Sequence, residues 1–347
     1  MLQLVVDQGG SDLHILIGSP PTIRVDGALI PIEGMPVLGP EQTKTLIEPI
    51  MTQEQKEYVM LNKELDFGYQ FGEYGRFRIN AYHSNGSLAA ALRLIPNETK
   101  TIEELSLPEV YHQFTKYKQG LVLVTGPTGE GKSTTLAALI EEINQNRTEH
   151  ILTIEDPIEF VYKPKSSIVS QRELNHDTQD WSIALRSALR EDPDVVLVGE
   201  MRDYETIAAA ITVAETGHLV FATLHTSTAA QTVDRIIDVF PAHQQGQIRQ
   251  QLASSIKAIV SQRLIPLKQG GRMAAAEVMI ANSAVRNLIR ESKTYQIDNV
   301  IQTSSGDGMM LMETSLALLV QQGYISQERA REFAFRPDEL SRLLRGE

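Results

Sequence analysis

The sequence contains a phosphate-binding motif. Residues 126–133 read GPTGEGKS, which matches the pattern G-x-x-x-x-G-K-[ST] between a strand-like and a helix-like run. The glycines let backbone N–H groups turn toward phosphates, and the following helix adds its positive dipole end. We expect Lys132 to reach the β- and γ-phosphates of ATP, with a catalytic role, and Ser133 to bind Mg²⁺. The candidate nucleotide-binding residues of this phosphate loop are Gly126, Thr128, Gly129, Gly131, Lys132, Ser133 and Thr134.

Carboxylates follow two further apolar runs. The run in DPDVVLVGEMRD ends at Gly199 and Glu200. Gly199 stands where many enzymes with a phosphate loop of this kind carry a metal-binding aspartate. Glu200 is therefore better placed to orient an attacking water than to hold metal. The run in TIEDPIEF ends with Glu155, Asp156 and Glu159. Glu155 or Glu159 could hold Mg²⁺ through water, and an exposed acidic turn is the alternative.

Two histidines flank another apolar run, HLVFATLH, at residues 218–225. Ligands bind at the carboxyl ends of parallel strands, so His225 is placed to sense or polarise the γ-phosphate. His218 could contact the same site across a loop or a subunit boundary. An extended run of this length spans roughly 23 Å, which is too far for one shared metal ion. Two hydrogen-bonded histidines without a catalytic role are the alternative.

The elements that must position these residues alternate between strand and helix. From Gly120 onward, apolar runs such as GLVLVTG, HILTIED and DVVLVGE are followed by helical patterns such as KSTTLAALIEEIN and ETIAAAITVAE. This alternation predicts a parallel sheet covered by helices, hence an α/β domain. From about Ala275 the chain reads as helical.

The first hundred residues have a different texture. Alternating runs surround Asp26-Gly27 and Asn85-Gly86, two strong hairpin signals, with helical spacing between them. This pattern predicts an α+β domain. The polar stretch PNETKTIEELSLPEV carries few bulky residues and reads as a linker. We therefore predict an N-terminal domain at 1–97, a linker at 98–111 and an ATPase domain at 112–347.

Composition excludes several classes of protein. The chain has 347 residues, 32 Lys plus Arg against 44 Asp plus Glu, and no cysteine. Disulfides and thiolate zinc sites are excluded, and the acidic balance argues against nucleic acid as a partner. No apolar run approaches the roughly 18 residues of a membrane span, and the N-terminus does not read as a secretory signal. We expect a cytoplasmic protein without membrane insertion.

Several motifs together resemble a known family. GPTGEGKST, TIEDPIEF, DPDVVLVGEMRD and TGHLVFATLHT resemble the four motifs of secretion and pilus motor ATPases. The further stretches GGSDLH, IRVDG, GRFRINAY and AVRNLIRE extend the resemblance over nearly the full chain. The combination is similar to the type IV pilus retraction ATPases, the PilT family.

The resemblance implies a fold, an activity and partners. It implies a PAS-like α+β N-terminal domain, a RecA-like ATPase domain with C-terminal helices, and a homo-hexameric ring that binds ATP and Mg²⁺ near its subunit boundaries. It also implies a motor that powers pilus retraction and twitching motility. The implied partners are an inner-membrane platform protein and an accessory retraction ATPase, and the implied location is the cytoplasmic side of the inner-membrane base of the pilus machine.

The resemblance also implies roles for matching residues. Glu200 resembles the catalytic glutamate, Glu159 the acidic-box carboxylate near the metal, and His218 and His225 the His-box pair. The basic positions of the N-terminal domain, some of which reach nucleotide within or across subunits, are matched by Arg76, Arg78 and Arg93. By their two-residue spacing Arg76 and Arg78 share one face of a strand. A surface salt bridge is an equal alternative for each of these arginines.

Two details stand apart from the main motifs. AVRNLIRE (284–291) is associated in the family with retraction, and by its spacing it is an amphipathic helix with Arg286 on the side opposite Val285 and Ile289. Glu130 occupies a loop position where the family usually has a small residue. Because a carboxylate repels phosphate, we expect Glu130 to face solvent or pair with a cation.

Other functions remain open from the sequence. An assembly or type II secretion ATPase would usually carry a four-cysteine zinc element, which this chain lacks. An accessory retraction ATPase shares most motifs. The acidic balance argues against a helicase, and salt-sensitive DNA binding would favour one again. A docking protein that binds ATP without hydrolysing it is a further alternative, which multiple turnovers would exclude.

Overall fold

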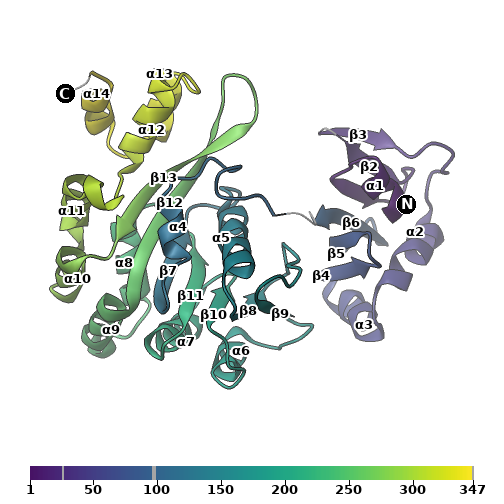
Figure 1. Cartoon of the computed structure of the whole chain (residues 1–347). Coiled ribbons are helices and arrows are strands. Elements are labelled where there is room, and N and C mark those ends of the chain that lie inside the picture. The colour runs from purple at the N-terminus through teal and green to yellow at the C-terminus, as the bar shows by residue number, and fades with distance from the viewer. Residues whose placement is uncertain (26, 96–98, 346–347) are drawn as a thin grey trace. The chain divides into compact units, whose positions relative to one another are not determined.

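The computed structural model describes residues 1–25, 27–95 and 99–345. The chain divides into two compact units (Figure 1). The first comprises Met1–Glu98 with Pro157–Val161, and the second comprises Thr99–Asp156 with Tyr162–Glu347. The predicted boundary between the N-terminal domain and its linker falls on residues 96–98, outside the described residues.

An antiparallel sheet forms the first unit. In its described part, six strands run in the order β3-β2-β1-β6-β5-β4. The hairpin between β5 and β6 turns at Asn85 and Gly86, with φ of 50° and 76°, as predicted. The predicted turn residue Asp26 lies outside the described residues. The elements are α1 (Leu2–Asp7), β1 (Asp12–Ile15), β2 (Thr22–Val25), β3 (Ala28–Pro31), α2 (Pro40–Ile47), η1 (Glu48–Ile50), α3 (Gln53–Asn62), β4 (Glu64–Phe71), β5 (Gly75–Ser84) and β6 (Ser87–Ile95).

One face of this sheet is covered by helices. Phe77 and Ile79 of β5 are fully buried and pack in one core with Ile47 of α2 and Val59 of α3. Because side chains alternate along a strand, the residues between them point to the opposite face. That face carries the arginines of β5.

A mostly parallel sheet forms the second unit. In the part of this unit that the structure describes, seven strands run in the order β13-β12-β7-β11-β10-β8-β9, and β13 alone is antiparallel to its neighbour. Among the described helices, none is long and apolar enough to cross a membrane. The elements up to the last strand are α4 (Tyr111–Phe114), β7 (Gly120–Thr125), α5 (Lys132–Asn146), β8 (His150–Glu155), β9 (Ile168–Glu173), α6 (Trp181–Ala188), β10 (Val195–Val198), α7 (Tyr204–Glu215), β11 (Leu219–Leu224), α8 (Ala229–Asp238), α9 (Ala242–Ser255), β12 (Ile256–Pro266) and β13 (Arg272–Ile280).

Both faces of the parallel sheet are covered. Leu121 and Leu123 of β7 join the core that contains α6, α7 and α8, while Val122, which points the other way, is equally buried. Helix α5 packs against β7 and lies in front of the sheet in Figure 1. An apolar run buried on both faces is typical of a central parallel strand. The predicted fold class, an α+β domain followed by a parallel-sheet ATPase domain with C-terminal helices, is confirmed.

The start of the C-terminal helical region was predicted wrongly. Residues 272–280 (RMAAAEVMI) form β13, and the helices begin at Ser283. The alanines favour a helix locally, but β13 pairs over its full length with β12, and this pairing overrides that preference. The last elements are α10 (Ser283–Arg290), η2 (Thr294–Gln296), α11 (Ile297–Thr303), η3 (Ser305–Asp307), α12 (Met312–Gln321), α13 (Gln327–Phe333) and α14 (Pro337–Arg345).

Helix α10 is an amphipathic packing helix with an unexpected role for one arginine. Val285 and Ile289 are fully buried. Arg286, predicted on the polar side, instead donates hydrogen bonds to the carbonyls of Ala253 and Ser254 at the end of α9. The last carbonyls of a helix lack partners within it, and a cation there also opposes the helix dipole. Arg286 therefore caps α9.

A buried acidic cluster joins β13 to the C-terminal helices. The side chains of Glu277 and Glu313 are fully buried, and the Arg336 guanidinium lies 3.5 Å and 2.9 Å from their carboxylates and also pairs with Asp298. Glu277 additionally accepts a hydrogen bond from the N–H of Ala229, at the start of α8. Burial is the main cause that raises the pKa of Glu277, to about 7. One guanidinium thus serves three carboxylates.

This pKa predicts a pH dependence of stability. The Glu277 carboxyl ionises near 4.5 in the unfolded chain and near 7 in the native one. Its contribution to the free energy of unfolding is therefore full below pH 4.5 and falls, by roughly 3 kcal/mol in total, as pH rises to about 7. Glu277→Gln removes this loss. We expect the urea midpoint of the variant, relative to wild type, to be higher at pH 8 than at pH 5.

The control for this experiment is Glu332→Gln, which changes an exposed carboxylate on α13. The difference between its urea midpoint and that of wild type should stay constant across the same pH range. The prediction fails if the difference between the urea midpoints of Glu277→Gln and wild type is the same at pH 5 and pH 8. The titration of Glu277 would then not govern stability.

Candidate active site

The phosphate loop connects β7 to α5 and lies tightly against β12. Gly126, Gly129 and Gly131 have φ of 142°, 83° and 79°, which side-chain-bearing residues rarely adopt. A Cβ atom on Gly126 would lie 2.4 Å from the carbonyl oxygen of Gln262. The loop can approach β12 this closely because residue 126 has no side chain.

The loop and the start of α5 have the groups that a phosphate needs. In the described structure, no side chain caps the N-terminus of α5, a helix of 15 residues, so its first N–H groups are suited to an anion. The Lys132 Nζ atom donates to the carbonyls of Gly126 and Pro127, at 2.7 Å and 3.0 Å. The ammonium is therefore held over the loop. Ser133 and Thr134 follow in the first turn of α5, and Thr128 is exposed at the tip of the loop.

Glu200 and His225 lie together at the carboxyl ends of neighbouring strands. Glu200 follows β10, His225 follows β11, and the His225 Nε2 atom lies 2.8 Å from Glu200 Oε1. The second carboxylate oxygen of Glu200 pairs with the Nε of Arg202 at 2.8 Å. This hydrogen bond raises the pKa of the Arg202 guanidinium. Glu200 is thus oriented by two basic side chains, and its own side chain is only 20% exposed.

Backbone contacts place this pair and the phosphate loop on one edge of the sheet. The N–H of Gly126 donates to the carbonyl of Leu224, directly before His225, at 3.2 Å. The Oγ1 of Thr223 donates to the carbonyl of Gly199, directly before Glu200, at 2.6 Å. The ends of β7, β11 and β10 therefore carry the loop, the histidine and the carboxylate side by side. This edge is where ligands bind in open α/β sheets.

Glu155 lies at the same edge, at the end of β8. Its side chain is buried and accepts hydrogen bonds from Thr153 and Gln171. A Cβ atom on Gly199 would lie 3.4 Å from the Glu155 Cα. Within the described ranges, no group of three acidic or histidine side chains could hold a metal ion by itself. Mg²⁺ binding by Ser133, with Glu155 or Glu159 through water, stays a prediction.

His218 does not join this group within one chain. It precedes β11, at the opposite end of the strand from His225. Its Nδ1 atom lies 3.0 Å from the carbonyl of Val213 and 3.2 Å from the Oγ1 of Thr216. These contacts are those of a strand-end histidine, and its catalytic role stays a prediction.

The predicted basic residues and Glu159 belong to the first unit. Arg76 and Arg78 share a face of β5, and Arg78 is paired in register with Arg93 of β6. Arg78 lies 3.8 Å from Glu159 and 3.6 Å from Asp66. The Nε of Arg93 lies 2.8 Å from Asp12. Their contacts to nucleotide, and that of Glu159 to the metal, stay predictions.

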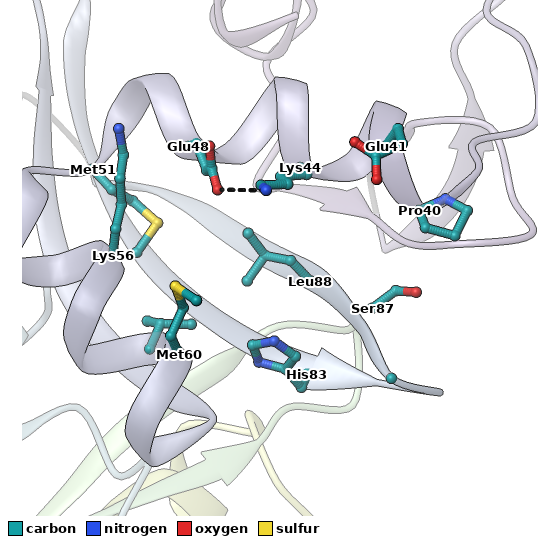
Figure 2. Close-up of a pocket in the computed structure, with 12 residues that line it drawn as sticks. Pro40, Glu41, Lys44, Glu48, Met51, Lys56, Met60, His83, Ser87 and Leu88 are labelled. Carbon is teal, nitrogen blue, oxygen red and sulfur yellow. Dashed lines mark ion pairs between the residues drawn. The ribbon is translucent and has the colours of Figure 1, made fainter.

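The first unit also has a pocket of about 230 Å³ between α2, α3 and the β5–β6 hairpin. Figure 2 shows the ion pair between Lys44 and Glu48 at one side, with Met60, His83 and Leu88 opposite. None of the predicted site residues is among the described residues that line it. The candidate active site is therefore the sheet edge of the second unit.

Three residues of this edge were not singled out from the sequence. Arg202 stands two residues after Glu200 in the motif GEMRD, and this proximity was a usable signal. Gln262 and Arg263 of β12 contact the phosphate loop from more than 130 positions away. No local sequence pattern predicts contacts between residues so far apart.

The family follows from a comparison of sequences. Residues 69–270, more than half of the chain, match the family described as Type II/IV secretion system protein. The chain belongs to this family. Its phosphate loop, Glu200 and His225 all lie within the matched residues.

The similarity to individual relatives covers nearly the full chain. A Pseudomonas aeruginosa protein described as "Type IV pilus retractation ATPase PilT" is 50% identical, covering 97% of this chain and 98% of the relative. The "Type IV pilus ATPase PilU" of the same organism is 39% identical, over 99% and 90%. The crystal structure of "the Pilus Retraction Motor PilT and Bound ADP" is 46% identical, covers 98% of both chains and has a TM-score of 0.91. The chain is thus a nucleotide-binding ATPase of this family.

Proposed function

We propose that this ATPase is a hexameric motor that hydrolyses Mg-ATP to power type IV pilus retraction. The observation that carries the proposal is 50% identity to the retraction ATPase over 97% of the chain, against 39% to PilU. We further propose that it works in the cytoplasm at the inner-membrane base of the pilus machine. Its partners there would be five copies of itself, an inner-membrane platform protein and an accessory retraction ATPase.

The geometry supports a division of labour among the residues of the second unit. Lys132 and the N–H groups at the start of α5 bind the phosphates and oppose their charge. Ser133, with an acidic side chain acting through water, would hold Mg²⁺, which neutralises charge on the phosphate oxygens. Glu200 orients the attacking water and accepts its proton on a carboxylate oxygen.

The two partners of Glu200 differ in solvent exposure. Arg202 is 59% exposed and His225 is 45% exposed. We assign the positioning role to His225, which follows the sheet directly, and we propose that Arg202 releases its carboxylate oxygen when water binds. The arginines of the first unit, Arg76, Arg78 and Arg93, would add positive charge from the same or a neighbouring subunit.

The test combines turnover, assembly and movement. Purified protein should hydrolyse ATP only with Mg²⁺, and the same sample should have the mass of a hexamer. Expression in a type IV-piliated bacterium that lacks its own retraction ATPase should restore pilus retraction. Turnover without restored retraction would reject the proposed role but not the ATPase. ATP binding without turnover in an assembled ring would favour the docking protein instead.

A further inference from the structure

Glu130 brings a carboxylate into the phosphate loop and directs it onto β12. Its Oε2 atom accepts a hydrogen bond from the backbone N–H of Leu264, and its Oε1 atom lies 3.5 Å from the Arg263 guanidinium. Its own carbonyl accepts a hydrogen bond of 2.7 Å from the side chain of Gln262. Three consecutive residues of β12 therefore hold this one position of the loop.

These contacts tie the loop at both of its ends. Gly126, at the beginning, lies against the carbonyl of Gln262. The side chain of Gln262 also accepts a hydrogen bond from Thr135, in the first helical turn after the loop. Glu130 thus completes a clamp in which β12 is the fixed element.

The clamp requires charge compensation. The side chain of Glu130 is 16% exposed, so water screens its charge weakly, and phosphate binds to the same loop. Arg263, at 26% exposure, is the cation paired with it. This guanidinium also lies over the ring of Phe335, 5.6 Å from its centroid, a cation–π contact that favours the observed position of the side chain.

We propose that Glu130 is a positioning residue for nucleotide binding and that Arg263 is its obligatory counter-charge. Glu130 fixes the phosphate loop on β12 through the Leu264 N–H, and Arg263 cancels the negative charge that this anchor places beside the phosphates. The inference rests on the proposed nucleotide site but not on pilus retraction. It predicts that removal of the Arg263 charge weakens nucleotide binding and that removal of the Glu130 charge does not.

The experiment measures the affinity of a fluorescent ADP analogue for four proteins at low salt. Arg263→Gln leaves the Glu130 charge uncompensated, so the Kd should rise roughly tenfold. Glu130→Gln retains a hydrogen-bond acceptor for the Leu264 N–H but removes the negative charge, so the Kd should stay equal or fall. The double variant should return to within about threefold of wild type.

Controls separate charge from structure. Arg329→Ala changes an exposed arginine paired with Glu332 on α13 and should leave the Kd unchanged. The effect of Arg263→Gln should shrink at high ionic strength. Thermal unfolding checks that each variant is folded. If Arg263→Gln is not folded, Arg263→Met replaces it, because Met also lacks the charge but retains an apolar contact for Phe335.

The possible outcomes differ clearly. A Kd that rises for Glu130→Gln, or a double variant as weak as Arg263→Gln, would overturn the proposal. Wild-type protein that binds no ADP would instead refute the nucleotide site itself. Loss of retraction with normal ADP binding would concern the motor function alone and leave the charge comparison valid.

Discussion

Glu200→Gln is expected to abolish ATP turnover while nucleotide binding persists. The substitution retains the size of the side chain and one oxygen acceptor for His225, which lies 2.8 Å away, but the amide cannot accept a proton from water. General-base catalysis contributes about 10²- to 10⁴-fold, so kcat should fall by at least roughly 100-fold. Because the change affects the transition state alone, the Kd for ATP should stay within about threefold.

The measurement is steady-state phosphate release beside ATP binding on the same preparation. Glu205→Gln is the matched control, since Glu205 is an exposed carboxylate on α7 whose ion pair with Arg186 is long, at 3.9 Å. Its kcat should equal that of wild type. Residual turnover of Glu200→Gln close to wild type would show that another group orients the water, with Glu155 as the next candidate.

The second large effect is expected for Lys132→Ala, which should lose nucleotide binding. Lys132 is nearly buried, and its ammonium is held by the loop carbonyls of Gly126 and Pro127. In the proposed complex it exchanges these neutral acceptors for phosphate oxygens, which form stronger, charge-assisted hydrogen bonds. Removal of such a partner should weaken ATP binding by roughly 100-fold and reduce turnover at least as much.

Lys118→Ala is the control for this loss of a cation. Lys118 is 80% exposed and pairs with Glu149 at the surface, so its removal should change neither Kd nor kcat measurably. A calorimetric titration with ATP gives the affinities. Lys132→Ala protein that still bound ATP as tightly as wild type would place the nucleotide elsewhere in the chain.

The residues that the sequence placed best are those at the ends of central strands. The runs around Val122, Val196 and Phe221 are apolar throughout because both faces of the sheet are covered. Such continuous apolar runs can be recognised in the amino-acid sequence. Strand ends meet at one edge, so Glu200 and His225 could be expected near the phosphate loop. Their direct contact in the structure agrees with that expectation.

Residues that depend on distant pairing could not be predicted in this way. The alanine-rich run before Val278 favours a helix by itself, and only its pairing with β12 makes it a strand. Gln262 and Arg263 matter because the loop lies against them, and no property of their neighbours in sequence indicates this. Arg286 has the spacing of a solvent-facing residue, although its partners include the last carbonyls of another helix.

The clamp on the phosphate loop has a consequence for how sequences of this kind can diverge. Position 126 faces a backbone carbonyl, which no substitution elsewhere can remove, so glycine there is fixed independently of the other residues. Positions 130 and 263 meet through side chains. Both positions can therefore change, but the order of the changes matters. Acquisition of the acid before its cation would pass through a poorly binding ancestor, whereas the reverse order would not.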